Sequence, residues 1–290
     1  MTSVIRLVAT VLLAMPFLGC AAMSTRTEVT FPNVTPGAPL EISAVLVRPA
    51  GQGPFPAVVQ FHGCAGVSNQ SYLWAAWLAE RGYVALVVDS FGPRAVNADC
   101  RGGEDEPPIT ARFDDGIGAL RYLQSLPFVC LDRVAAIGWS QGGVYAIAMI
   151  NGPSLERARA RGVDLPAVGF AAAVGIYPGG CPSLAKELVI RPLLVLIGAS
   201  DDWTRAEKCE EMVTAMRARG ADASIVIYPG AYHYFDVIGQ PLTVLPDVEN
   251  ALKSGGYGAT VGYQPAAARD AHQQVEAFLA QHLEGAAPAP

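Results

Sequence analysis

The sequence predicts an α/β protein with a mostly parallel, doubly wound sheet that is covered by helices on both faces. Three observations lead to this prediction. Short apolar segments alternate with helical segments, most of the apolar segments lack the polar positions of a half-exposed strand, and hydrophobic residues make up 51% of the 290 residues. Strands that are apolar along their whole length are buried on both faces, which is typical of parallel sheets between helices.

The individual elements follow from local patterns, taken in chain order. Strands are expected where apolar and β-branched residues run together, at 41–49, 56–63, 83–90, 133–140, 168–178, 192–200 and 223–230. Helices are expected where apolar residues recur every three or four positions, at 71–82, 111–126, 141–150, 204–220 and 265–283. The segment 236–264 is punctuated by glycine and proline, and it is interpreted either as a lid or as a surface connection.

No change of composition marks a second domain, so residues 27–284 are predicted to form one domain, followed by a disordered tail at 285–290. The formal net charge is −6, and basic residues do not cluster. Nucleic acid is therefore not an expected partner, because neutralising phosphates requires grouped Lys and Arg. Histidine and cysteine spacings typical of a zinc site are also absent, so no metal is expected.

The N-terminus has the layout of a secretory signal peptide. A single cation precedes an apolar run at 7–18, and small residues follow. Residues 1–22 are predicted to be this signal, with two alternatives for its removal: cleavage before a lipidated Cys20, or ordinary cleavage after Ala22. Either alternative predicts export, to the periplasm or to the outer membrane as a lipoprotein. A lipid anchor on Cys20 is the only membrane contact expected.

A lone serine stands between glycines in "AIGWSQGG", at Ser140. It follows a predicted strand and precedes a predicted helix. A serine here could simply cap the helix. The pattern Gly-x-Ser-x-Gly is also typical of a nucleophile that is presented on a sharp strand-to-helix turn.

A nucleophilic serine requires a base and an orienting acid, which in hydrolases of this kind follow it in the order acid, histidine. His233 is the only histidine that comes directly after a predicted strand downstream of Ser140. The preceding strand ends in two carboxylates, Asp201 and Asp202. The spacing from Gly198 favours Asp201 as the acid, and Asp202 remains the alternative.

Two backbone amides are candidate donors to the oxyanion of such a reaction. One belongs to Gln141, directly after the serine, and the other to Cys64, in the loop "HGCAG" that follows an earlier strand. His62 is interpreted as a brace for this loop rather than as a reacting group.

Cys181 and Cys209 are predicted to form a disulfide. Each follows one of two consecutive strands, and such strands are often neighbours, so both sulfurs should lie at the carboxyl edge of the sheet. Two reduced, buried thiols are the alternative. The redox states of Cys64, Cys100 and Cys130 are left open.

With these motifs, the chain resembles the dienelactone hydrolase family from about Glu41 to Leu283. The resemblance rests on "FHGCAG", "VVDSFGPR", "AIGWSQGG", "YPGG", "LIGASDDWTRAEKC", "YPGAYHYFD" and the final "GYQPAAARDAHQQVEAFLAQHL". It implies an α/β-hydrolase fold. The founding lactonases of the family use a cysteine nucleophile, so Ser140 favours a general ester hydrolase.

The resemblance also suggests residues that bind substrate. Family lactonases hold a substrate carboxylate with arginines, so Arg94 either does the same or hydrogen-bonds to loop carbonyls. Trp203 and Tyr234 flank the acid and the base, and they either line an acyl pocket or pack the loops.

Together these features predict a hydrolase of carboxylic esters or lactones with the triad Ser140, Asp201 and His233, an acyl-enzyme intermediate, a small-molecule substrate, and no metal or cofactor requirement. The alternative is a non-catalytic binding protein of the same fold at the cell envelope.

Overall fold

The computed structural model describes residues 24–97, 99–101 and 107–283. Its centre is an eight-stranded sheet in the order β1-β2-β4-β3-β5-β6-β7-β8. These strands are β1 (Thr25–Pro32), β2 (Glu41–Arg48), β3 (Phe55–Phe61), β4 (Val84–Asp89), β5 (Val129–Trp139), β6 (Ala172–Ile176), β7 (Leu193–Gly198) and β8 (Ala223–Tyr228).

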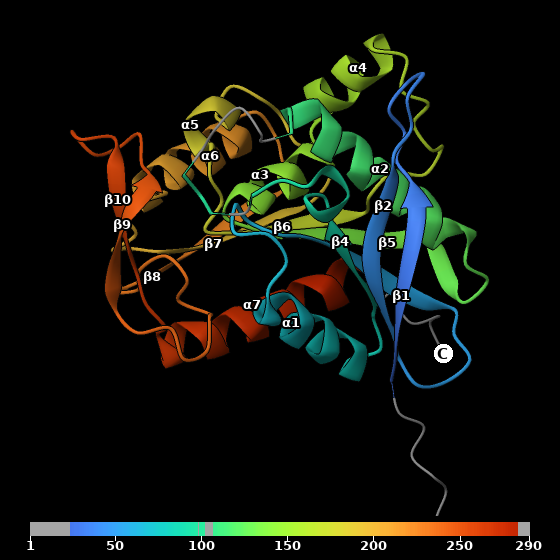
Figure 1. The fold of residues 1–290 in the computed structure, drawn as a ribbon, viewed down its shortest axis with the longest axis horizontal. Helices are drawn as coiled ribbons and strands as arrows, with labels where there is room; N and C mark the ends of the chain where they lie inside the picture. The colour runs from blue at the N-terminus through green and yellow to red at the C-terminus, as the bar shows by residue number, and fades with distance from the viewer. Residues whose placement is uncertain (1–23, 98, 102–106, 284–290) are drawn as a thin grey trace, which may run out of the picture.

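Along the sheet, neighbouring strands are parallel from β4 through β3, β5, β6 and β7 to β8. Strand β2 runs antiparallel to both of its neighbours, β1 and β4. In Figure 1, helices α1 and α7 lie on one side of the sheet, and α2, α3 and α6 lie on the other. The helices are α1 (Asn69–Glu80), α2 (Ile109–Ser125), α3 (Gln141–Ala148), α4 (Gly152–Ala160), α5 (Cys181–Leu184), α6 (Ala206–Ala218) and α7 (Pro265–Leu283). The predicted α/β fold with a mostly parallel, helix-covered sheet is confirmed.

The core is built from the apolar strand residues that the sequence patterns predicted. Every residue of β6 and β7 is buried, as expected for inner strands between two layers of helices. Because parallel strands point the same way, the loops that follow β3, β5, β6, β7 and β8 all open at one edge of the sheet.

Several elements were not predicted. The first strand, β1, reads "TRTEVTFP" and is mostly exposed, so only its pairing with β2 makes it a strand. The segment 236–264 contains a two-stranded antiparallel sheet of β9 (Thr243–Glu249) and β10 (Tyr257–Val261), which projects from one end of the molecule (Figure 1). The proline within β9 hid this strand from sequence reasoning.

No helix in the described ranges is both long and apolar enough to cross a membrane. The predicted signal peptide at 1–22, the lipidation of Cys20 and the tail at 285–290 lie outside the described residues.

Candidate active site

Ser140 lies on the turn between β5 and α3, with φ 53° and ψ −118°. A positive φ is unusual for any residue other than glycine. The flanking glycines allow the turn, because a Cβ on Gly138 would lie 2.1 Å from the Gly142 carbonyl oxygen and a Cβ on Gly142 would lie 2.1 Å from that of Phe61. The serine side chain therefore stands at the carboxyl edge of the sheet, and the residue is 6% exposed.

Asp201 and His233 meet at the same edge, directly after β7 and shortly after β8. His233 Nδ1 lies 2.7 Å from Asp201 Oδ2, and both side chains are buried. The carboxylate also accepts hydrogen bonds from the amides of Trp203 (2.9 Å) and Thr204 (2.8 Å) and from the Thr204 hydroxyl (3.0 Å). Because a carboxylate only accepts hydrogen bonds, this contact requires a proton on Nδ1 of His233.

Asp202, the alternative acid, points away from His233. Its carboxylate accepts hydrogen bonds from Lys253 Nζ (2.7 Å) and from the amide and hydroxyl of Thr260 (2.8 and 2.9 Å). Partial burial would raise the pKa of Asp202, but the hydrogen bonds from Lys253 and Thr260 outweigh it and lower the pKa below its ordinary value. Asp202 thus attaches the loop after β7 to the β9–β10 hairpin.

The hydroxyl of Ser140 and the ring of His233 do not form a hydrogen bond in this structure. His233 Nε2 is buried and has no hydrogen-bond partner among the described residues. The rings of Tyr177, Trp203 and Tyr234 surround it, with centroids 4.3, 4.8 and 5.0 Å from that of the imidazole. Hydrogen bonds of this kind are often long in unliganded sites and tighten when substrate binds.

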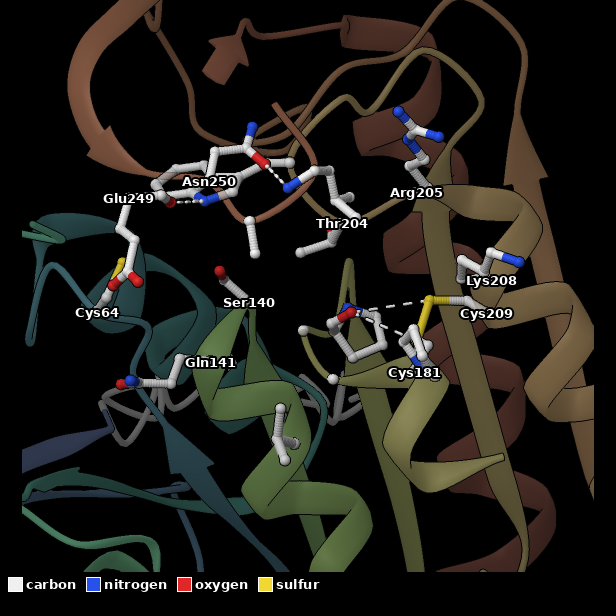
Figure 2. Close-up of a pocket in the computed structure, with 18 of the residues that line it drawn as sticks. Cys64, Ser140, Gln141, Cys181, Thr204, Arg205, Lys208, Cys209, Glu249 and Asn250 are labelled. Atoms are coloured by element: carbon white, nitrogen blue, oxygen red, sulfur yellow. Dashed lines mark hydrogen bonds between the residues drawn. A yellow bond between two sulfur atoms is a disulfide. The ribbon is translucent and has the colours of Figure 1, made fainter. Parts of the chain in front are cut away.

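Two cavities meet at Ser140. The larger, about 440 Å³, lies between α3, the loops after β6 and β7, and the hairpin, and the Ser140 hydroxyl points into it (Figure 2). The smaller, about 150 Å³, lies between the loops after β3 and β8. Trp203 lines the larger cavity and Tyr234 the smaller one.

The two predicted amide donors belong to residues on the wall of the larger cavity. Cys64 follows β3, and Gln141 is the first residue of α3. The Gln141 side chain accepts a hydrogen bond of 2.6 Å from the buried Arg112. Arg112 also donates to the carbonyl of His62 (2.6 Å), so one guanidinium joins the loop that carries Cys64 to the start of α3.

His62 braces its loop, as the sequence indicated. Its Nδ1 lies 2.7 Å from the carbonyl of Gly63, and its Nε2 accepts from the amide of Ser90 at 3.2 Å. Burial, with a contribution from the nearby Arg112 cation, holds the pKa of His62 well below its ordinary value. A neutral imidazole fits both hydrogen bonds.

Arg94 does not lie at the site. Its guanidinium makes two hydrogen bonds of 2.8 Å to Asp115 and one of 2.7 Å to the carbonyl of Ser90, and it lines neither cavity at Ser140. The bond to the Ser90 carbonyl agrees with the alternative, in which Arg94 hydrogen-bonds to loop carbonyls, and the binding of a substrate carboxylate stays a prediction. Asp115 is a fully buried carboxylate within α2, and a buried charge needs a partner.

Two disulfides border the larger cavity. Cys181 and Cys209, the predicted pair, are joined with a Cα–Cα distance of 5.0 Å. Cys64 and Cys100, whose redox state the sequence left open, are also joined, at 4.9 Å. All four cysteines line the cavity, whereas Cys130 is free and half-buried.

Besides Arg112, two residues that build the site were not predicted from the sequence. Thr204 hydrogen-bonds to Asp201 and lies 3.3 Å from His233 Nδ1. Asp236 is buried beneath the site and hydrogen-bonds to Trp139, the residue before Ser140. Asp236 stands three residues after His233, and a carboxylate so close to a predicted base was the available signal. No group of His, Cys, Asp or Glu in the described part of the chain is arranged to hold a metal ion.

Comparison with known proteins agrees with this architecture. A Bradyrhizobium protein described as a probable 2-oxo-3-(5-oxofuran-2-ylidene)propanoate lactonase is 26% identical over 203 residues, covering 66% of this chain and 78% of the relative. The solved dienelactone hydrolase from Anabaena variabilis aligns with a TM-score of 0.57 and 18% identity, covering 89% of this chain and 99% of its own. Esterase 2 of Thermogutta terrifontis, solved after phosphorylation by paraoxon, aligns with a TM-score of 0.60 and 18% identity over 90% and 96% of the two chains.

The solved structures share the fold at low identity. The sequence profile of the dienelactone hydrolase family matches residues 42–283, which is most of the chain. The chain therefore belongs to the dienelactone hydrolase family, within the α/β-hydrolase superfamily.

Proposed function

We propose that this hydrolase cleaves carboxylic esters or lactones through Ser140, His233 and Asp201. The observation that carries the proposal is the convergence of three groups at one sheet edge: a serine on a strained turn that opens into a cavity, and a buried imidazole bonded at 2.7 Å to a carboxylate. This combination is the usual arrangement for nucleophilic attack on a carbonyl carbon.

In the first step the Ser140 oxygen attacks the carbonyl carbon while His233 Nε2 takes its proton. The step requires the Ser140 hydroxyl and His233 Nε2 to come into hydrogen-bond contact. This contact is expected to form when substrate binds. Asp201 holds the imidazole in the productive tautomer and stabilises its cation. The amides of Cys64 and Gln141 donate to the oxyanion.

The intermediate then collapses, the bond to the alcohol oxygen breaks, and His233 gives its proton to that oxygen. The acyl group remains on Ser140 as an ester. A water molecule repeats the sequence: His233 takes a proton from it, its oxygen attacks the acyl carbon, and Ser140 leaves with the proton. The carboxylic acid is released and the serine is restored.

The unequal volumes of the two cavities indicate where the acyl part and the alcohol part of the ester lie. At roughly 30 Å³ per group of the size of a water molecule, the smaller cavity holds about five such groups and the larger one about fifteen. The acyl group stays on Ser140 until water attacks, whereas the alcohol must leave. Arg205, Glu249 and Leu252 on the rim of the larger cavity are exposed, so we assign the alcohol to that cavity and a short acyl group to the smaller one.

A fluorophosphonate probe and an ester series test the proposal together. The purified protein should be labelled by the probe, and it should hydrolyse p-nitrophenyl acetate and butyrate faster than the octanoate. Ser140→Ala should abolish labelling and lower kcat by roughly 10⁴- to 10⁶-fold, the range for loss of such a nucleophile.

Hydrolysis by Ser140→Ala at near the wild-type rate would contradict the mechanism. A folded wild-type protein that neither labels nor hydrolyses any ester or dienelactone would instead support a non-catalytic binding protein. A preference for long acyl chains would overturn only the assignment of the cavities.

A further inference from the structure

Asp236 is a buried carboxylate that is held by uncharged donors. Asp236 is only 3% exposed. The oxygen Oδ2 accepts hydrogen bonds from Gln70 Nε2, Trp74 Nε1 (3.1 Å) and Trp139 Nε1 (2.9 Å), and Oδ1 accepts one from the Tyr177 hydroxyl (2.7 Å). Burial raises the pKa of Asp236, against the hydrogen bonds from Tyr177, Trp139 and Trp74.

Two other buried carboxylates are held differently, by arginines. Asp114 and Asp115, on α2, pair with Arg161 and Arg94. Burying a carboxylate is costly, and an apolar side chain would fill the same space without that cost. The hydrogen bonds of Asp236 therefore point to a role beyond packing.

The donors to Asp236 belong to the segments that carry the proposed triad. Trp139 directly precedes Ser140 in the chain. Tyr177 follows β6, and its ring packs on His233 with a centroid distance of 4.3 Å. Asp236 itself lies in the loop of His233. One carboxylate thus connects the serine turn, the ring that supports the histidine, and the histidine loop.

We propose that Asp236 is a positioning residue that fixes the serine turn and the histidine loop relative to each other. The inference rests on the proposed function. Ser140 and His233 are not hydrogen-bonded to each other in the structure, so their alignment depends on the scaffold that carries them. Trp139 and Tyr177 each provide one rigid link from that scaffold to Asp236.

The test compares Asp236→Asn with Asp115→Asn. Both changes neutralise a buried carboxylate in the same core, but Asp115 lies on α2 and binds Arg94 and Asn33. Asparagine at 236 retains one acceptor oxygen and replaces the other by an amide N–H₂, so at least one of the present donors loses its acceptor. We expect a roughly 100-fold lower kcat, the scale for a misplacement of about 1 Å, with KM changed less than about threefold.

Asp115→Asn should lower the melting temperature and leave kcat per folded molecule unchanged. Labelling by the fluorophosphonate should slow in Asp236→Asn in proportion to kcat, because labelling reports the serine without substrate turnover. Folded Asp236→Asn with kcat within about threefold of wild type would overturn the inference.

If Asp236→Asn does not fold, Tyr177→Phe tests the positioning role of Asp236 instead. It removes the hydroxyl that binds Asp236 and retains the ring on His233, so kcat should fall by roughly tenfold at a similar KM. An unchanged kcat in this variant would also contradict the inference. Failure of the wild-type protein to label or hydrolyse would instead reject the proposed function.

Discussion

The two sides of Ser140 are built by different means. On one side, around the smaller cavity, the end of β5 at Trp139 and the loop of Tyr177 are joined to the loop of His233 by hydrogen bonds to the buried carboxylate of Asp236. On the other, around the larger cavity, two disulfides and the β9–β10 hairpin form the wall. We refer to them as the hydrogen-bonded side and the disulfide side.

The difference follows from how much core each side has. The hydrogen-bonded side rests on the main core beneath the sheet edge, where a polar group must be satisfied internally. On the disulfide side, Cys181 and Cys209 belong to the main core, but the hairpin and the Cys64–Cys100 bridge lie over a small separate cluster of Cys100, Val248 and Ala259. Such a cluster buries little apolar area, so the Cys64–Cys100 link supplies rigidity that packing does not.

The loop after β7 belongs to both sides. Asp201 faces His233, and its neighbour Asp202 faces Lys253 and Thr260 of the hairpin. Adjacent carboxylates in one loop thus serve opposite sides of the site.

The largest expected contrast is between Asp201→Asn and Asp202→Asn. Asp201→Asn should lower kcat by roughly 10⁴-fold, because an amide stabilises the wrong tautomer of the histidine. Asp202→Asn should change kcat by less than about tenfold, because it loosens only the hairpin. Steady-state kinetics of both variants at equal folded concentration measures the contrast. If Asp202→Asn is the more damaged variant, the assignment of the acid is wrong.

Removing the disulfides one at a time is expected to have an intermediate effect on stability and, for one of them, on kcat. The chain-entropy relation gives roughly 3.5 to 4 kcal/mol of stability for loops of this length. The melting temperature should therefore fall in both double variants, Cys64→Ala/Cys100→Ala and Cys181→Ala/Cys209→Ala. Only the first pair should also lower kcat, by about tenfold, because Cys64 carries a proposed oxyanion donor. Equal kcat losses in both variants would remove this distinction between the two bridges.

The smallest effect on catalysis is expected for Arg94→Ala, because Arg94 lies on neither side of the site. The change leaves Asp115 buried without its counter-charge, so thermal unfolding should reveal a loss of about 3 to 5 kcal/mol. KM and kcat of the folded fraction should be unchanged for both neutral and carboxylate-bearing esters. A KM that rises selectively for the carboxylate-bearing esters would restore a binding role for Arg94.

The order and type of the inner elements were predictable because their signals are local. Apolar strands such as 193–198 and the glycines around Ser140 carry their structural reason in their own residues. The spacing of Asp201 and His233 after consecutive strands likewise predicted that they would meet, since parallel strands end at one edge. The pairing of Cys181 with Cys209 follows from the same rule.

Other features depend on partners that are distant in the chain. Strand β1 is polar and becomes a strand only beside β2. The pairing of Cys64 with Cys100 requires the loops after β3 and β4 to meet beside the hairpin. Arg94 is directed to Asp115, and Asp236 to Trp74 and Trp139, because a buried polar group bonds to whatever donor or acceptor folding brings within reach. Local pattern determines which residues form the proposed triad, whereas tertiary packing decides which partners the buried charges around it bind.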